Sequence, residues 1–202
     1  MACENGHIDV VKHLCLDSRV DVMAQNNDGF VWACNRGHLD VVKHLSLDPR
    51  VDVATQNNAG FVWACYSGHI EVVKHLCSDT RVDVAARNNE GFRRACVNGH
   101  LEVVKHLSLD PRIDVAAENN YGFREACTSG CIKVVKYLCM DLQLDLTAQN
   151  NLGFRWVGNC AFKVVKLLKP VIAKRYGWNS KKLKCILKYL NIHNFHWIER
   201  YV

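Results

Sequence analysis

The sequence lacks the features that mark membrane, secreted and enzymatic proteins. No apolar run reaches the roughly 18–20 residues that a membrane-spanning helix needs, so we expect a soluble chain. Residues 1–7 show neither the basic nor the apolar segment of a secretory signal. The chain has no Gly-rich phosphate loop, no nucleophile elbow and no His-Glu-x-x-His motif. We therefore expect neither enzymatic activity nor a bound cofactor.

What the sequence does contain is a regular repeat. Its hydrophobic content of 49% excludes a disordered chain, because so much apolar surface would not stay unburied. The triplet Val-Val-Lys begins at positions 10, 41, 72, 103 and 134, and again at 164. The pair Gly-Phe begins at 29, 60, 91, 122 and 153, with the same period of 31 residues. Such a period predicts stacked structural units.

One unit, residues 29–59, illustrates the predicted structure. Residues 30–36 place Phe, Ala and Cys on one edge of a short helix, and Gly37 can end it in the left-handed conformation. Residues 38–47 form a second amphipathic helix, which we expect Pro49 to terminate. Residues 51–53 alternate like a short strand, and residues 56–58 are a turn cluster. A single unit cannot bury both helices, so we predict an all-α solenoid with short extended fingers.

The second helices resemble those of ankyrin repeats. Residues 37–43, 68–74 and 99–105 read Gly-His-Leu/Ile-Asp/Glu-Val-Val-Lys, and the turns resemble those of divergent ankyrin arrays in giant viruses and some protists. The resemblance covers residues 1–168, as a partial first unit, four full units and a degenerate last one. It implies an intracellular scaffold that binds a partner protein through its concave face. The usual Thr-Pro-Leu-His opening is absent, and the period is shorter than the standard of about 33 residues.

Most cysteines and histidines belong to the repeat. Five of the 11 Cys share one position, and eight of the 10 His fall on two positions. Cys34 and His38 are four residues apart, but Gly37 separates them, and no Cys-x2-Cys pair exists. We expect no metal site; instead we expect buried thiols and imidazoles with local hydrogen bonds. Free thiols favour a reducing compartment, the cytoplasm or the nucleus.

The positive charge is concentrated at the C-terminus. Residues 163–202 carry ten basic residues and one acidic residue, whereas the whole chain has a net charge of +6. We interpret residues 169–202 as a basic, amphipathic helical cap on the array. The alternative is that this segment also binds an anionic partner, whether nucleic acid, acidic lipid or an acidic protein. Its candidate residues are Lys174, Arg175, Lys181, Lys182, Lys184 and Lys188.

The positions that vary between copies are the candidate partner-binding residues. The resemblance places them on the concave face of a monomer, at the finger tips and along the first helices. Trp32 and Trp63 are the sharpest candidates, and they either anchor a partner or stack on each other between units. The full set is Asp28, Trp32, Asn35, Arg36, Ala59, Trp63, Tyr66, Ser67, Glu90, Arg94, Val97, Asn98, Tyr121, Glu125 and Thr128.

Overall fold

A computed structural model describes residues 1–140, and this part of the chain holds nine helices and no strand. The helices are α1 (Ile8–Leu16), α2 (Ala24–Arg36), α3 (Leu39–Leu47), α4 (Thr55–Ser67), α5 (Ile70–Ser78), α6 (Ala86–Asn98), α7 (Leu101–Ser108), α8 (Ala117–Thr128) and α9 (Ile132–Met140). The predicted all-α architecture of helix-turn-helix repeats is confirmed. The chain divides into two compact units, residues 1–95 with 102–114, and residues 96–101 with 115–202.

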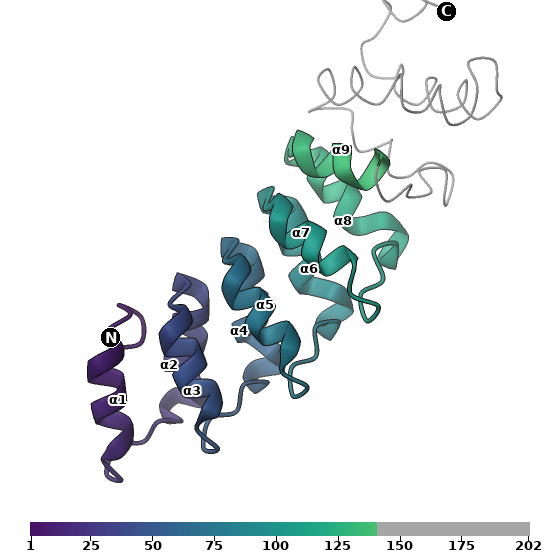
Figure 1. Cartoon of the computed structure of the whole chain (residues 1–202). Coiled ribbons are helices and arrows are strands. Elements are labelled where there is room, and N and C mark those ends of the chain that lie inside the picture. Colours follow the sequence, from purple (N-terminus) through teal and green to yellow (C-terminus); the bar gives the residue numbers. More distant parts are fainter. Residues whose placement is uncertain (141–202) are drawn as a thin grey trace, which may run out of the picture. The chain divides into compact units, whose positions relative to one another are not determined.

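In the first compact unit, equivalent helices lie side by side. Figure 1 shows α1, α3 and α5 next to one another, and α2 packs against α4. The helix pairs of each repeat are joined as predicted, because Gly37 and Gly68 adopt the left-handed conformation, with φ of 78° and 81°. Within residues 1–140, no helix is both long and apolar enough to cross a lipid bilayer.

Each first helix begins with a left-handed turn. In α4 the residues Gln56, Asn57 and Asn58 have φ of 51°, 55° and 62°, which confirms the predicted turn cluster. Asparagine tolerates this region better than most residues, because its short polar side chain can hydrogen-bond locally. In α2, the right-handed helix therefore resumes at Asp28, two residues before the predicted start at Phe30.

An aspartate side chain closes the turn after the second helices, with or without a proline beside it. The Asp48 carboxylate accepts a hydrogen bond from the backbone N–H of Arg50 at 3.0 Å. Asp79 accepts the same bond from Arg81 at 3.0 Å, although Thr80 stands where the preceding repeat has Pro49. The helix ends at Leu47, before Pro49, as predicted. The repeat with Thr80 shows that the aspartate side chain closes the same turn where proline is absent.

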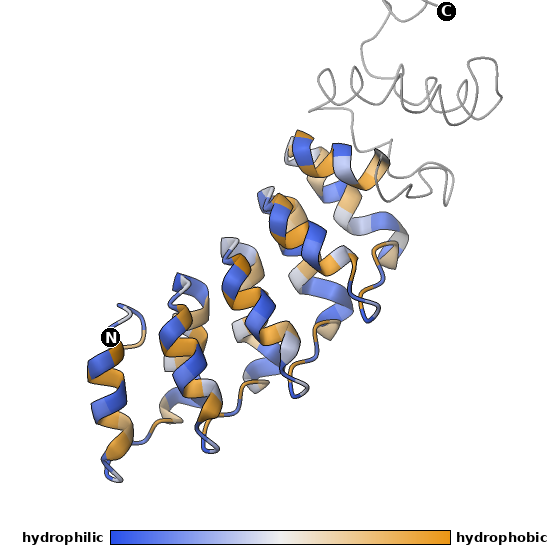
Figure 2. Cartoon of the chain, in the orientation of Figure 1, coloured by the Kyte–Doolittle hydropathy of each residue, from blue (hydrophilic) through white to orange (hydrophobic). Residues whose placement is uncertain are grey.

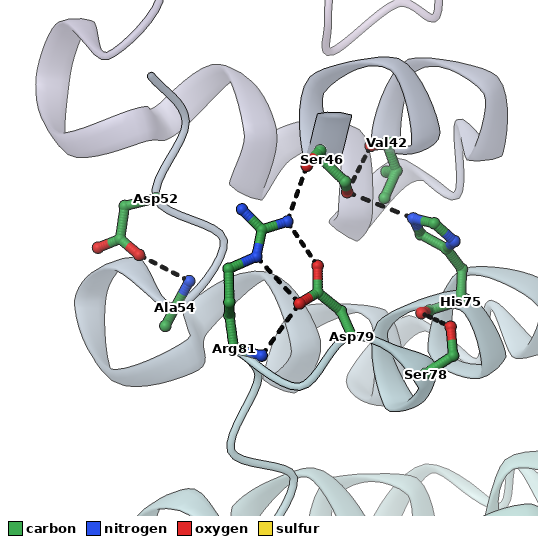
Figure 3. A network of polar contacts seen from close by, with 8 residues as sticks. All are labelled: Val42, Ser46, Asp52, Ala54, His75, Ser78, Asp79 and Arg81. Carbon is green, nitrogen blue, oxygen red and sulfur yellow. Dashed lines mark hydrogen bonds and ion pairs between the residues drawn. The ribbon is translucent and has the colours of Figure 1, made fainter. Parts of the chain in front are cut away.

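The same arginines join neighbouring repeats. Nη2 of Arg81 donates a hydrogen bond to the Asp79 carboxylate at 2.6 Å. The same Nη2 also donates to the carbonyl oxygen of Ser46 at 2.7 Å, at the end of the preceding second helix (Figure 3). Arg50 and Arg112 repeat this contact at the carbonyl oxygens of Cys15 and Cys77. Orphan carbonyls at a helix C-terminus thus receive a charged donor from the next repeat.

The finger loop over residues 51–53 contains no strand, in agreement with the predicted all-α fold. Val51 and Val53 are buried and Asp52 is exposed, so the alternation is present, but no strand forms here. A strand needs a neighbouring ladder of backbone hydrogen bonds. In the next finger the N–H of Asp83 instead donates to the side-chain oxygen of Asn58, 25 residues earlier, at 2.9 Å.

The core consists of small residues beside large ones. Phe30 and Phe61 are almost completely buried, and the adjacent Ala33 and Cys34 are fully buried. A Cβ atom added at Gly60 would lie 2.9 Å from Cε1 of Phe30, so α2 and α4 approach closely because this residue has no side chain. Figure 2 shows the matching amphipathic pattern, with hydrophobic and hydrophilic bands along the same helices.

The remaining sequence-based expectations lie outside the described residues. These are the degenerate last repeat, the cap over residues 169–202, and the anion-binding set Lys174, Arg175, Lys181, Lys182, Lys184 and Lys188.

Candidate functional site

Two tryptophans from successive first helices line one cavity. Trp32 in α2 and Trp63 in α4 are each 43% exposed, and the cavity between them has a volume of about 210 Å³. Its lining, which we call the aromatic hollow, consists of Asp28, Val31, Trp32, Asn35, Gln56 and Trp63. The exposure shows that these indoles are not buried in the interior of the repeat stack.

The polar side chains around the aromatic hollow are held in place by hydrogen bonds. The Gln56 amide donates to a carboxylate oxygen of Asp28 at 3.1 Å and to the carbonyl oxygen of Asn26 at 3.2 Å. The Asn35 side-chain oxygen accepts from the Ser67 hydroxyl at 2.8 Å. These bonds link α2 to α4, so the polar part of the hollow is preorganised before any partner arrives.

The two tryptophans have different neighbours. The guanidinium of Arg36 lies over the Trp32 ring, 5.9 Å from its centroid, and donates to Glu4 at 3.1 Å. Trp63 instead makes an edge-to-face contact with Tyr66, with the ring centroids 5.3 Å apart and an interplanar angle of 75°. The Tyr66 side chain is itself exposed.

An arginine-rich cluster borders the aromatic hollow. Arg87 donates to the backbone oxygen of Gln56 at 2.6 Å, and both Arg87 and Arg94 donate to the carboxylate of Glu90. Burial by itself would raise the pKa of Glu90, but the hydrogen bonds from Arg94 and Arg87 outweigh it and hold this pKa below its ordinary value. Two guanidinium groups share one carboxylate, which leaves this Arg87–Glu90–Arg94 cluster with a net charge of +1.

The structure brings seven of the predicted residues together in the first compact unit. They are Asp28, Trp32, Asn35, Arg36, Trp63, Tyr66 and Ser67. Glu90 and Arg94 belong to the adjoining cluster. Ala59 is only 5% exposed, so it offers a partner little contact area.

The other predicted residues lie elsewhere. Val97 is half-buried, and its carbonyl oxygen accepts a hydrogen bond from the Cys131 thiol at 3.3 Å, while Asn98 is exposed at the end of α6. Tyr121, Glu125 and Thr128 lie in α8, within the second compact unit, where the Arg124 guanidinium is 5.2 Å from the Tyr121 ring centroid.

Gln56 was missed by the sequence reasoning. We assigned it to the turn cluster as a structural residue, although its position varies between copies as Gln25, Gln56, Arg87 and Glu118. That variation is the same signal that selected Trp63, so it could have identified Gln56 as well. Val31 also stands at a position that varies between copies, and it lines the aromatic hollow although it was not in the predicted set.

The histidines that follow the left-handed glycines, such as His38 and His69, connect neighbouring repeats. The Nε2 atoms of His38 and His69 hydrogen-bond to the carbonyl oxygens of Glu4 and Asn35, at 2.8 and 2.9 Å. The ring of His69 packs where Gly37 has no side chain. The expectation of local hydrogen bonds was therefore wrong, since each bond reaches back 34 residues into the preceding repeat.

The cysteines at the repeated first-helix position, Cys34, Cys65, Cys96 and Cys127, are buried, as predicted. Burial raises the pKa of the Cys34 and Cys96 thiols above the ordinary value, and it raises that of Cys77 to about 11. Among residues 1–140, no three His, Cys, Asp or Glu side chains are grouped as metal ligands would be. On the helix surfaces, Lys74 and Lys105 pair with Glu71 and Glu102 at 2.8 and 3.0 Å.

Comparison with protein families agrees with this architecture. A family profile described as ankyrin repeats in three copies matches residues 1–88 and again residues 30–119. The chain belongs to the ankyrin-repeat family. No curated protein matches the chain. Ankyrin repeats are in general modules for protein–protein interaction, and proteins built from them are typically scaffolds without enzymatic activity.

Proposed function

We propose that this ankyrin-repeat chain is a non-enzymatic scaffold that binds a partner protein through the first-helix face around the aromatic hollow. The observation that supports the proposal is the pair of indoles, 43% exposed at the same position of successive repeats, which line one cavity. Exposed tryptophans in a preorganised pocket are typical anchors of protein interfaces. The resemblance to ankyrin repeats implies that this face is the concave one, which ankyrin proteins use for binding.

The face offers anchors and a polar rim together. Trp32, Trp63 and Tyr66 supply apolar contact area, whereas Asp28 and Asn35 supply hydrogen-bonding groups at the margin. Since hydrogen bonds already link α2 to α4 here, the surface would lose little conformational entropy on binding. Affinity would therefore come from a few side chains of a rigid scaffold.

The experiment is a peptide-display selection against the folded chain, followed by affinity measurements on substituted chains. We expect Trp63→Ala to weaken the selected binders by about 30-fold or more, as expected for truncation of an aromatic anchor, and Tyr66→Ala to weaken them less. The matched control is Leu47→Ala, because Leu47 is 84% exposed but lies at the end of α3. Circular dichroism establishes that each variant is folded. Binders that tolerate Trp63→Ala would show that this face is not the interface.

A second candidate function rests on the charge of the C-terminal segment. The excess of basic residues over residues 163–202 favours binding of an anionic partner. We expect retention on heparin that falls steeply with salt and is lost when Lys174, Arg175, Lys181, Lys182, Lys184 and Lys188 are all replaced by Gln. Retention that is insensitive to salt would dispose of this candidate.

A further inference from the structure

The repeat of Trp63 has no arginine at the position from which Arg36 contacts Trp32. Arg36 stands four residues after Trp32 in α2 and places its guanidinium over that ring. The equivalent position in α4, four residues after Trp63, is Ser67, whose hydroxyl donates to Asn35 instead. The structure therefore shows a guanidinium on one indole of the aromatic hollow and no equivalent side chain in the next repeat.

The charge of the aromatic hollow favours a cation. Asp28 is the only charged residue among the six that line it. One carboxylate oxygen of Asp28 accepts from Gln56, which leaves the second oxygen to accept from a ligand. The faces of the two indoles are electron-rich and attract cations. The nearby Arg36 does not reverse this preference, because Glu4 neutralises its charge.

We propose that the aromatic hollow takes an arginine side chain of the partner, with the guanidinium against Trp63 and hydrogen-bonded to Asp28. This inference rests on the proposed function and adds the chemistry of the partner. Arginine fits better than lysine, because a planar guanidinium can stack on an indole while its N–H groups reach a carboxylate. The contact between Arg36 and Trp32 is an internal example of this stacking.

The neighbouring cluster selects against a polybasic partner. The Arg87–Glu90–Arg94 cluster adjoins the aromatic hollow through Gln56 and carries a net charge of +1. A second basic side chain there would meet two arginines, whereas an acidic one would be attracted. Adjacent helices pack about 8–10 Å apart, and an extended peptide covers about 3.3 Å per residue. The partner segment therefore carries an arginine and an acidic residue about three positions apart.

The experiment uses capped peptides and the indole N–H signals of the ¹⁵N-labelled full chain. The probe is acetyl-Gly-Arg-Gly-Gly-Glu-Gly-amide, together with its reversed sequence, since the direction of binding is open. One control peptide has citrulline in place of arginine, which keeps the shape and removes the charge. A second control peptide has arginine in place of glutamate. Trp32→Phe and Trp63→Phe variants assign the two indole signals.

We expect at least one Arg–Glu peptide to shift the Trp63 signal and to bind at least about 5-fold more tightly than the citrulline peptide, as a cation–π contact with a carboxylate predicts. The diarginine peptide should bind more weakly than the Arg–Glu peptide. Asp28→Asn should reduce the affinity, whereas Asp40→Asn, an exposed aspartate on α3, should leave it unchanged.

The inference and the proposed function fail separately. Equal binding of the arginine and citrulline peptides, or an unchanged Trp63 signal, would overturn the arginine site. Display-selected peptides that depend on Trp63 but contain no arginine would likewise overturn it and leave the binding face intact. Selected peptides that bind equally well to the Trp63→Ala chain would overturn the face itself and the arginine site with it.

Discussion

Three glycines at the same position of successive first helices offer a test of how the repeats pack. An added Cβ would lie 2.9 Å from Phe30 Cε1 at Gly60 and 2.6 Å from Phe61 Cε1 at Gly91. At Gly29 the nearest atom would be the thiol sulfur of Cys3, at 3.3 Å. The same substitution to alanine therefore meets a buried aromatic ring at two sites and a half-buried thiol at the third.

Two opposing effects set the magnitude. Alanine in place of glycine within a helix stabilises the fold by about 0.5–1 kcal/mol, while overpacking a core costs about 1–3 kcal/mol. We expect Gly60→Ala and Gly91→Ala to lower the free energy of unfolding by about 1–2 kcal/mol, because Phe30 and Phe61 are buried and cannot move aside. Gly29→Ala should be neutral or raise it by up to about 1 kcal/mol.

The assay is urea denaturation of the full chain followed by far-ultraviolet circular dichroism, with the wild-type chain measured alongside. The three variants share the chemical change and the place in the repeat, so helix propensity contributes equally to all of them. The packing argument fails if Gly29→Ala is as destabilising as Gly91→Ala.

Three further predictions concern the contacts between repeats. Gly37→Ala should destabilise the chain more than Gly130→Ala, as measured by urea denaturation of both variants. Both glycines are left-handed, with φ of 78° and 71°, so the backbone strain of the two substitutions is similar. Of the two, only the new Cβ at Gly37 would overlap a side chain, the ring of His69. Arg81→Gln should cost about 1 kcal/mol through loss of the bond to the Ser46 carbonyl, whereas Arg19→Gln, whose arginine hydrogen-bonds only within its own turn, should leave the urea midpoint unchanged. Hydrogen bonds from arginine hold the pKa of Asp48, Asp79 and Asp110 below the ordinary value. The stability that these pairs contribute is therefore present above about pH 4 and is lost as the pH falls through the folded-state pKa. Urea midpoints at pH 7, 5 and 3 should therefore decline chiefly over the last interval, and a chain with Asp79→Asn should decline less.

The helices and their glycine boundaries could be read from the sequence because they depend on local rules. A glycine such as Gly37 ends a helix because it readily adopts the left-handed conformation. Apolar residues spaced by three and four positions define the buried face of a helix. Because the pattern repeats every 31 residues, the secondary structure predicted for residues 29–59 also applied to the following copies. The same comparison of copies selected Trp32 and Trp63 as candidates, whereas their exposure was decided by the tertiary structure.

Contacts between repeats were decided only in the tertiary structure. The local pattern could not show that His69 reaches the carbonyl of Asn35, that Arg81 binds that of Ser46, or that Asp79 closes its turn without proline. Burial of Ala59 and the part of Gln56 in the aromatic hollow also depend on the neighbouring repeat.

The sequence by itself determined the repeating unit, since each unit's helices follow from short-range periodicity and capping. The tertiary structure determined which polar groups pair across units and which side chains share a cavity, because those outcomes depend on the distance and angle at which one repeat meets the next.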